Sequence, residues 1–401
     1  MRIFFIATKL NFTKGGSMVE NDLTARTLQG LGNEVTMLTV FSELNDFSQS
    51  PPAYRIIEER IKNKRQLTIL WNTVWFMRAY SDQADIFYIE GQTFFYGAGL
   101  YRWLGGKRPV VAFFVREQVS WQENISALFW RNDTLGLART FYSLKRTIRW
   151  YIERYIFIHF ANFVDFFTWG SPLLRREYED FGLVTEGKSM IIGDPYPWDE
   201  VMKKYGVMEH SYANRTEKKD ILTILYSARM APGKGFDVLL QAFSRIKNKN
   251  RFRLVLGGDG PERPLIEGMI KDLGLEYFVS VTGWIPKVDF HKSLMGADIF
   301  IYPRWRTAQP ALGLSEAMAF GIPSIVPENT GLHWVAGGGA LTFKLDDSGD
   351  LAEKIETLGN NKEMRIMLSK KCHERLLKPD VNYRLTMPAI YEAMEKLIKP
   401  L

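Results

Sequence analysis

One short stretch of the sequence places two cations where they suit the binding of a phosphorylated ligand. In residues 226–243, YSARMAPGKGFDVLLQAF, Arg229 follows a predicted strand and Lys234 lies five residues later, in a Pro-Gly-Lys-Gly turn before a predicted helix. Two cations beside the amino end of a helix favour a diphosphate, because the helix end adds positive potential to theirs. Two solvated surface charges are the alternative, but the glycines and the strand-end position favour a diphosphate clamp.

A second stretch, RWRTAQPALGLSEAMAFGIP at 304–323, contains a single acid, Glu316. It follows the predicted strand at 299–303. The residues that open the helix carrying Glu316 are expected to turn unpaired backbone N–H groups towards phosphate or sugar oxygens. The residues that open the helix are Pro310, Ala311, Leu312 and Gly313, and the last three supply the N–H groups because proline has none.

Two further glycine-rich turns follow predicted strands. Gly15 and Gly16 allow close approach of a ligand to the backbone, although a bare turn explains them equally well. The turn LVLGGDGPE at 254–262 lacks the third glycine of a dinucleotide-binding fingerprint. We therefore interpret it as shaping the wall of the site, and a dehydrogenase is a distant alternative.

The elements that must position these turns alternate between β-rich runs and segments of helical periodicity, which indicates parallel sheets of the α/β class. The expected strands are RIFFIA, EVTMLTV, DIFYIE, PVVAFFV, FVDFFTW and SMIIGD in the first half, and LTILYSA, RLVLGG, VSVTG, DIFIYP and PSIVP in the second. We expect a first domain over 1–198, a polar linker at 199–219 and a second domain over 220–382. A final helix at 383–401 is expected to return to the first domain.

Composition limits the classes of protein and partner. The chain has 401 residues, enough for two domains, and a net charge of +7 that favours anionic partners. The apolar run at the start is too short for a signal peptide, and the single cysteine, Cys372, forbids an intrachain disulfide. We therefore expect a cytoplasmic location. The histidines and this cysteine lack metal-ligand spacing and there is no Asp-x-Asp triplet, so no metal or other cofactor is expected.

Five motifs in order carry a family resemblance. ARMAPGKGFDVLLQAF, LVLGGDGPE, VTGWIP, ADIFIYP and SEAMAFGIP resemble the family 4 retaining glycosyltransferases of the GT-B fold. The resemblance implies two Rossmann-like domains facing across a cleft. It also implies transfer of a sugar from a UDP- or GDP-linked donor to a glycan or lipid-linked acceptor, without a catalytic nucleophile.

The resemblance assigns roles to individual residues. Arg229 and Lys234 match the basic pair set against the donor diphosphate. Trp284 and Ile285 match the segment that meets the base, and Glu316 matches the second glutamate of a Glu-x7-Glu motif, which bonds the ribose. Gly16 matches a glycine loop that faces sugar and phosphate.

The sequence also departs from the family pattern. Ala308 stands where the first glutamate of the motif contacts the donor sugar, and Arg116 and Glu117 stand where a histidine is usual. An inactive, nucleotide-binding scaffold in glycan assembly therefore remains the alternative function.

A basic, aromatic segment at 139–160 remains unassigned by these motifs. It suits either an anionic membrane surface, on the inner face of the membrane, or an ordinary surface helix. Nucleic acid is disfavoured, because no nucleic-acid-binding module is present.

Overall fold

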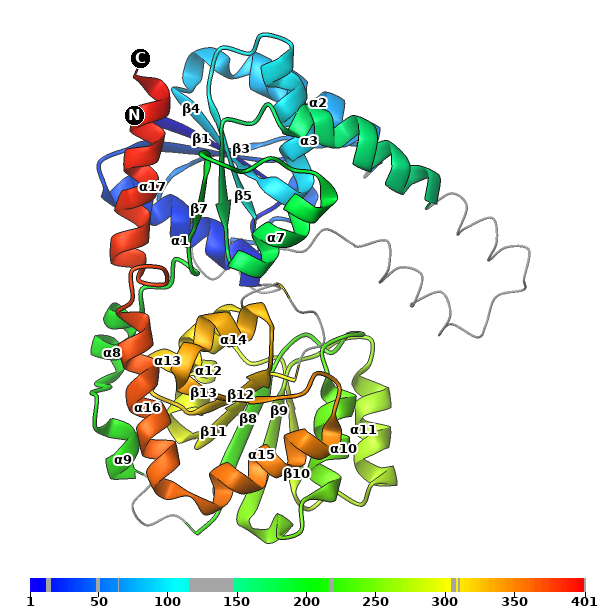
Figure 1. Cartoon of the computed structure of the whole chain (residues 1–401), viewed down its shortest axis with the longest axis vertical. Helices are drawn as coiled ribbons and strands as arrows, with labels where there is room; N and C mark the ends of the chain where they lie inside the picture. Colours follow the sequence, from blue (N-terminus) through cyan, green and yellow to red (C-terminus); the bar gives the residue numbers. More distant parts are fainter. Residues whose placement is uncertain are drawn as a thin grey trace, which may run out of the picture. The chain divides into compact units, whose positions relative to one another are not determined.

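The computed structural model describes residues 1–11, 16–47, 51–63, 65–114, 147–215, 220–303, 308 and 311–399 (Figure 1). The chain divides into two units, each described separately below. Unit 1 comprises Met1–Ile192 and Met387–Leu401, and unit 2 comprises Gly193–Thr386. The segment expected as a linker, 199–219, belongs to unit 2 and contains two helices, α8 (Trp198–Tyr205) and α9 (Ser211–Arg215). The final helix, α17 (Tyr383–Ile398), begins in unit 2 and continues into unit 1.

Unit 1 contains a sheet of seven parallel strands in the order β3-β2-β1-β4-β5-β6-β7. The strands are β1 (Arg2–Ala7), β2 (Glu34–Thr39), β3 (Arg55–Glu58), β4 (Ile86–Glu90), β5 (Val110–Phe114), β6 (Phe166–Trp169) and β7 (Ser189–Ile191). The helices are α1 (Gly16–Gly30), α2 (Gln66–Ala79), α3 (Gly91–Trp103), α6 (Ile158–Ala161) and α7 (Pro172–Phe181), and a π-helical turn, Glu153–Phe157, precedes α6.

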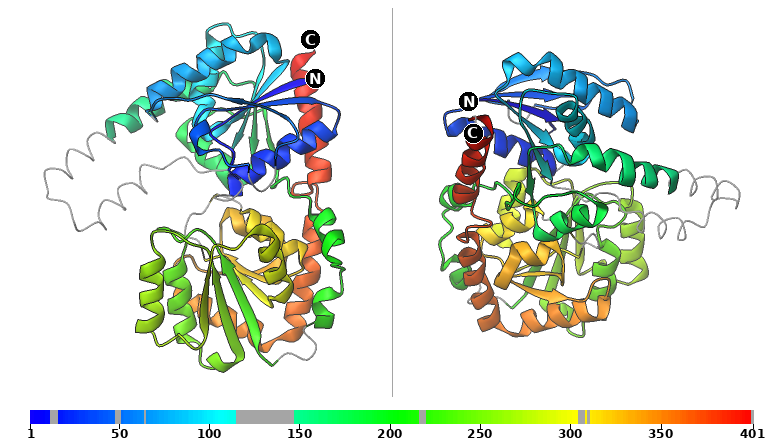
Figure 2. Two further views of the ribbon diagram at one scale, coloured as in Figure 1. Left: turned by 180° about the vertical axis from the view of Figure 1, so that it is seen from behind. Right: turned by 45° about the horizontal axis from the view of Figure 1, so that its top comes forward.

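The apolar strand sequences explain why the sheet of unit 1 is covered on both faces. Every residue of β4 and β5 is buried, as in a parallel sheet with helices on each side. The connections from β1 to β2 and from β4 to β5 run in opposite directions across the sheet. Right-handed crossovers therefore place α1 on one face and α3 on the other. Figure 2 shows helices on either side of the strands.

Local sequence signals set the helix ends. Helix α7 begins after Ser171, whose hydroxyl accepts a hydrogen bond from the Leu174 amide over 3.0 Å. Proline at its first position, Pro172, fits because an amide is not needed there. Gly182 ends the helix with φ +110°, a conformation that glycine adopts without strain.

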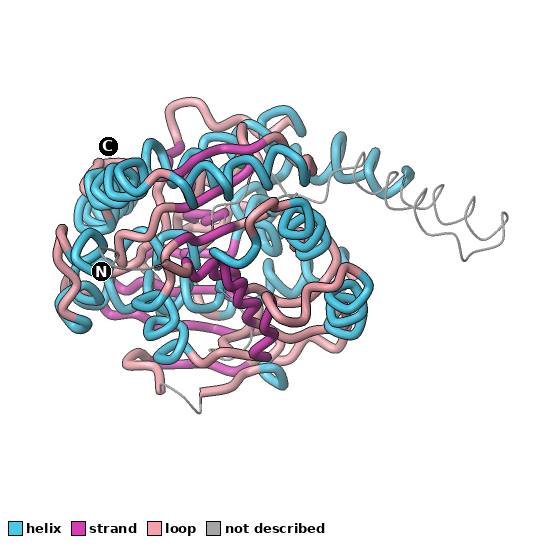
Figure 3. Tube along the Cα trace, turned by 90° about the horizontal axis from the view of Figure 1, so that it is seen from below, coloured by secondary structure: helices cyan, strands magenta, loops and turns pink. Residues whose placement is uncertain are grey.

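Unit 2 contains a second parallel sheet of six strands in the order β10-β9-β8-β11-β12-β13. Its strands are β8 (Leu222–Ser227), β9 (Phe252–Gly257), β10 (Val279–Gly283), β11 (Ile299–Ile301), β12 (Ser324–Pro327) and β13 (Ala340–Phe343). Besides α8 and α9, its helices are α10 (Phe236–Arg245), α11 (Arg263–Asp272), α12 (Lys287–Gly296), α13 (Leu312–Ala319), α14 (Gly331–Ala336), α15 (Ser348–Asn360) and α16 (Lys362–Leu376). Figure 3 shows the strands in the interior, with helices packed around them.

The strand order of unit 2 determines where a ligand site belongs. From β8 the chain proceeds to β9 and β10 on one side, and from β11 it proceeds to β12 and β13 on the other. The order therefore reverses between β8 and β11, which are hydrogen-bonded neighbours. In open parallel sheets, ligands bind beyond the carboxyl ends of the strands at such a reversal.

Candidate nucleotide site in unit 2

The turn after β8 contains the two cations singled out in the sequence. Arg229 is exposed, and Lys234 is half-buried. Gly233 and Gly235 adopt φ values of +79° and +73°, which let the chain turn sharply into α10. Tyr226 on β8 stabilises the turn, because its hydroxyl donates a 2.6 Å hydrogen bond to the carbonyl oxygen of Lys234.

This turn packs tightly against the end of β11. A Cβ atom added at Gly235 would lie 2.0 Å from the carbonyl oxygen of Pro303, so no larger residue fits there. The turn after β8 and the chain leaving β11 are therefore in direct contact at the reversal of strand order. That position is where the topology predicts a ligand.

The turn after β9 closes the other side of the Arg229 turn. Cβ atoms added at Gly258 and Gly260 would lie 1.9 Å and 2.3 Å from the carbonyl oxygens of Ala228 and Met230. The glycines of LVLGGDGPE thus allow two backbones to approach each other, which agrees with the structural role expected for them.

The chain after β10 holds the two residues expected to meet a base. A Cβ atom at Gly257 would lie 2.5 Å from Cδ1 of Ile285, so Ile285 packs on the end of β9. The neighbouring Trp284 is 48% exposed. An exposed indole beside this edge has a flat apolar face available for stacking.

Helix α13 follows β11 and carries Glu316 in its second turn. Ala311 is its N-cap residue and makes no side-chain cap, so Leu312 and Gly313 lie in a first turn whose amides lack helical acceptors. Glu316 is only 6% exposed. Its Oε1 lies 3.1 Å from Nε2 of His291 and 3.8 Å from Nζ of Lys287, both on α12. These contacts fix the orientation of the carboxylate.

A second acid lies near Glu316, and sequence reasoning missed it. Asp194 is 6% exposed and accepts a 3.2 Å hydrogen bond from the hydroxyl of Ser315. Burial raises the pKa of Asp194 to about 6, and the negative charge of Glu316 adds to the shift while the Ser315 bond opposes it. Asp194 is therefore an acid close enough to Glu316 to interact with it electrostatically, although it comes from another part of the chain.

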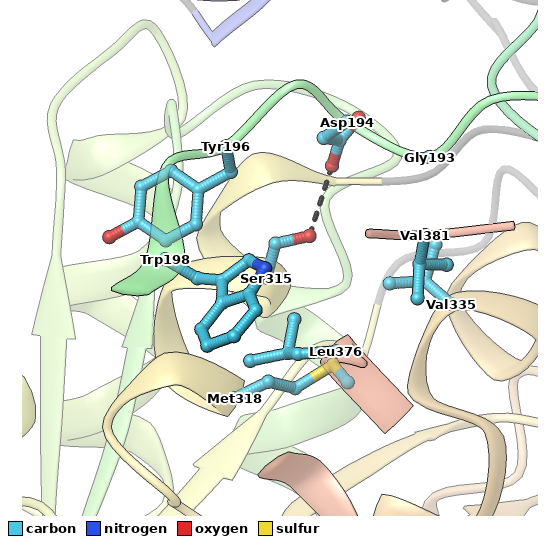
Figure 4. Close-up of a pocket in the computed structure, with 9 residues that line it drawn as sticks. All are labelled: Gly193, Asp194, Tyr196, Trp198, Ser315, Met318, Val335, Leu376 and Val381. Carbon is cyan, nitrogen blue, oxygen red and sulfur yellow. Dashed lines mark hydrogen bonds between the residues drawn. The ribbon is translucent and has the colours of Figure 1, made fainter. Parts of the chain in front are cut away.

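Asp194 and Ser315 line a small pocket within unit 2 (Figure 4). Its wall comes from the segment after β7, from α13 and α14, and from both sides of the end of α16. The lining residues are Gly193, Asp194, Tyr196, Trp198, Ser315, Met318, Val335, Leu376 and Val381. In Figure 4 the aromatic rings of Tyr196 and Trp198 lie on one side and the aliphatic side chains on the other.

In unit 1 the corresponding reversal of strand order lies between β1 and β4. Glu90, at the end of β4, is 4% exposed and accepts hydrogen bonds from the amide and the hydroxyl of Thr8 over 2.9 Å and 2.8 Å. Gly16 is the first residue of α1, the helix that follows β1 in the chain. Four residues expected in the site lie outside the described part of the chain, namely Gly15, Arg116, Glu117 and Pro310.

Comparisons with known proteins find a family match within unit 2. Residues 209–375, all in unit 2, match the family model described as Glycosyl transferases group 1. The lipopolysaccharide core biosynthesis glycosyltransferase LpsE of Rhizobium meliloti (strain 1021) is 27% identical over 162 residues, covering 39% of this chain and 45% of LpsE. LpsD of the same strain is 30% identical over 154 residues, covering 37% of this chain and 43% of LpsD. The chain thus matches less than half the length of either relative.

Among solved structures, the similarity extends over the whole chain. The complex of Anabaena Alr3699/HepE with UDP superposes with a TM-score of 0.72 at 14% sequence identity, covering 99% of this chain and 100% of that protein. At this identity the likeness concerns the fold alone. The chain therefore has a fold of two Rossmann-like α/β domains, as its structural neighbours do, and its residues 209–375 match the family model described as Glycosyl transferases group 1.

Proposed function

We propose that this chain is a family 4, retaining glycosyltransferase that moves a sugar from a UDP- or GDP-linked donor to a glycan or lipid-linked acceptor. The proposal rests on three features that occur together in unit 2. The first is the match to the family model, and the second is the reversal of strand order, which lies within the matched region. The third is the presence of Arg229, Lys234 and the start of α13 in the turns at that reversal. The proteins LpsE and LpsD act in lipopolysaccharide core biosynthesis, which supports a glycan or lipid-linked acceptor here.

In this proposal, each part of the donor meets a group suited to its chemistry. Arg229, Lys234 and the first amides of α13 face the diphosphate, where positive potential stabilises the charge. Glu316 accepts hydrogen bonds from the ribose hydroxyls, and its bond to His291 keeps the carboxylate in place. Trp284 and Ile285 provide apolar contact to the base. The complex of HepE with UDP supports a nucleotide as ligand.

The reaction breaks the bond between the anomeric carbon and the phosphate oxygen of the donor. It forms a bond from that carbon to the acceptor oxygen on the same face of the sugar, so the configuration is retained. The acceptor proton passes to the departing phosphate oxygen, and Arg229 and Lys234 stabilise the charge that develops on the diphosphate. Removing one such preorganised donor from a site costs about 3 to 4 kcal/mol of barrier reduction. The proposal requires no metal ion.

We also propose a cytoplasmic location for this activity. Cys372, the one cysteine in the sequence, is buried and free. Burial raises its pKa to about 12, so the thiol stays protonated and unreactive. A chain without a disulfide is suited to a reducing compartment.

The proposal is tested by incubating the purified protein with a panel of UDP- and GDP-sugars. Thermal stabilisation first identifies the nucleotide, because a ligand that binds only the folded state raises the melting temperature. Release of the nucleoside diphosphate, with and without candidate lipid-linked acceptors, then measures turnover, and NMR of the product reports the anomeric configuration. An inverted product would overturn the retaining mechanism, whereas stabilisation without turnover on any donor would favour the scaffold.

A further inference from the structure

Three neighbouring helical segments of unit 1 carry most of its exposed large apolar side chains. The segments are α2, α3 and the helix at 147–161, which includes the π-helical turn and α6. Of the thirteen exposed large apolar residues of unit 1 within the described ranges, eleven lie on these segments or directly after them. We name them the apolar surface: Leu67, Trp71, Trp75, Trp103, Leu104, Ile148, Tyr151, Ile152, Tyr155, Ile156 and Phe163.

The three segments form one continuous layer because α3 lies between the other two. A Cβ atom at Gly97 would lie 2.6 Å from Cβ of Thr73 on α2. A Cβ atom at Gly99 would lie 1.9 Å from the carbonyl oxygen of Phe160. Residues two apart point to nearly opposite sides of a helix, so these glycines let α3 pack closely on both neighbours. Figures 1 and 2 show the three segments together on one side of unit 1.

Helix α2 is apolar on the side that faces away from the protein as well as on its packed side. Its buried side chains include Leu70, Val74 and Met77. Leu67, Trp71 and Trp75 recur at a spacing of four and therefore share one face, where they are 59%, 58% and 57% exposed. Single exposed apolar residues are common on soluble proteins, but a contiguous group of this kind marks a surface that is covered in use.

The charged residues of the segments that carry the apolar surface are almost all positive, and one of these cations, Arg102, is paired over 2.8 Å with Asp165, which lies just outside the segments. The ranges 65–79, 91–108 and 147–163 together contain seven arginine or lysine residues and one acid, Glu153. That acid is 6% exposed, and its Oε1 lies 2.6 Å from Nε of Arg149. No exposed acid lies in these ranges, all of which the structure describes. The partner of this surface must therefore offer negative charge together with an apolar phase.

We propose that the apolar surface docks onto an anionic lipid bilayer, with its tryptophan and tyrosine rings at the level of the lipid headgroups. Such rings favour this interface, since they are apolar with one polar atom, and nearby arginine and lysine side chains bind anionic lipid phosphates. Across the described residues, the structure contains no helix long and apolar enough to span a bilayer. Docking therefore occurs from one side, with the helices lying along the surface. The proposal does not depend on the glycosyl transfer proposed above.

The experiment is sedimentation of the full chain with vesicles of phosphatidylcholine, with or without phosphatidylglycerol. We expect binding to the anionic vesicles that weakens as salt is added. The Trp71→Ser/Trp75→Ser double variant should bind about tenfold more weakly or worse, because two large apolar side chains are lost. Arg78→Gln and Lys107→Gln, both exposed, should each weaken binding about fivefold at low salt.

Matched control variants distinguish binding by the apolar surface from nonspecific adsorption of exposed apolar side chains to vesicles. Leu265 and Tyr277 lie on unit 2 and are 61% and 74% exposed, and the Leu265→Ser/Tyr277→Ser variant should bind vesicles like the native chain. Nucleotide-induced thermal stabilisation should be the same in all variants, so failure of membrane docking is distinguishable from failure of the proposed activity. Equal binding to neutral and anionic vesicles, or native-like binding by the tryptophan variant, overturns the proposal. Conversion of a dimer to a monomer by the tryptophan variant, without vesicle binding, assigns the surface to a second copy of the chain.

Discussion

The hydroxyl of Ser315 donates a hydrogen bond to Oδ2 of Asp194 over 3.2 Å, joining two residues that are 121 positions apart. Ser315 directly precedes Glu316, so the bond brings the segment after β7 to the helix that carries the proposed ribose ligand. The hydrogen bond from Ser315 to Asp194 therefore helps to hold α13, the helix that carries Glu316, in position. Its ionisation adds a second negative charge near Glu316.

The first prediction concerns the pH dependence of stability at Asp194. Its pKa in the folded protein, about 6, lies above the ordinary value of 3.8, so the folded state holds this proton more tightly than the unfolded state. The contribution of Asp194 to the free energy of unfolding is therefore greatest below pH 3.8. It falls as pH rises to about 6, by at most about 3 kcal/mol.

The Asp194→Asn variant tests this directly. Its amide oxygen still accepts the bond from Ser315, but it has no proton to lose. Chemical denaturation of both proteins across this pH window should show the variant gaining stability relative to the native chain as pH rises. Parallel curves would show that Asp194 titrates normally.

The strands were largely predictable because their apolar runs are long enough to be distinctive. RIFFIA is β1, and LTILYSA contains β8. Two strands were missed, β3 and β13. Both lie at sheet edges and are only partly buried, so their sequences lack the continuous apolar pattern of central strands. The helices α8 and α9 were missed because the charged segment that holds them resembles a loop.

The candidate site was predictable only where it follows the strand pattern. Arg229, Lys234 and the start of α13 lie at strand ends, and strand ends can be located from sequence. Asp194 could not be found in this way, because its contact with Ser315 depends on how the chain returns after β7. His291 was likewise missed as the partner of Glu316, since one histidine on a helix carries no signal of its own.

The second prediction concerns Glu316. Glu316→Ala should weaken binding of the nucleoside diphosphate by about tenfold or more, because hydrogen bonds to a charged group are worth about 1.5 to 3 kcal/mol. Isothermal titration calorimetry measures the change. Glu276→Ala, at an exposed acid of unit 2, is the control and should bind normally. Unchanged affinity in Glu316→Ala would remove the ribose assignment.

The third prediction concerns the proposed diphosphate clamp. Arg229→Ala and Lys234→Ala should each lower kcat by a factor of hundreds while leaving the melting temperature nearly unchanged, because neither side chain is fully buried. Steady-state kinetics and thermal unfolding report the two quantities separately. Lys271→Ala removes an exposed cation from α11 and should be neutral in both. Native turnover in both clamp variants is the result that contradicts the mechanism.

The fourth prediction concerns the glycine that lets the Arg229 turn pack on β11. Gly235→Ala should destabilise unit 2 and weaken nucleotide binding, because φ is +73° and the added Cβ would meet Pro303 at 2.0 Å. Gly268→Ala is a matched control in the interior of α11, where a Cβ meets nothing within 4 Å. That variant should be more stable by up to about 1 kcal/mol, since alanine favours the helix. Thermal unfolding of Gly235→Ala and Gly268→Ala, measured with and without nucleotide, compares the stability and the nucleotide binding of the two variants.

The last prediction concerns Ala308, which stands where the family resemblance implies a sugar-binding glutamate and is 1% exposed. We expect the native protein to transfer sugar from more than one donor, because the amides of α13 bond phosphate without selecting among sugars. The missing carboxylate bond, about 1.5 to 3 kcal/mol, weakens discrimination but is small beside the barrier reduction of an enzyme. Ala308→Glu should narrow donor choice and lower the melting temperature, because a charge enters a buried position. Ala308→Gln adds the same bulk without the charge, so kcat/KM measured over several donors separates the carboxylate from its size. If the native chain transfers from no donor and Ala308→Glu does, the protein is a degenerate enzyme and the scaffold function is correct.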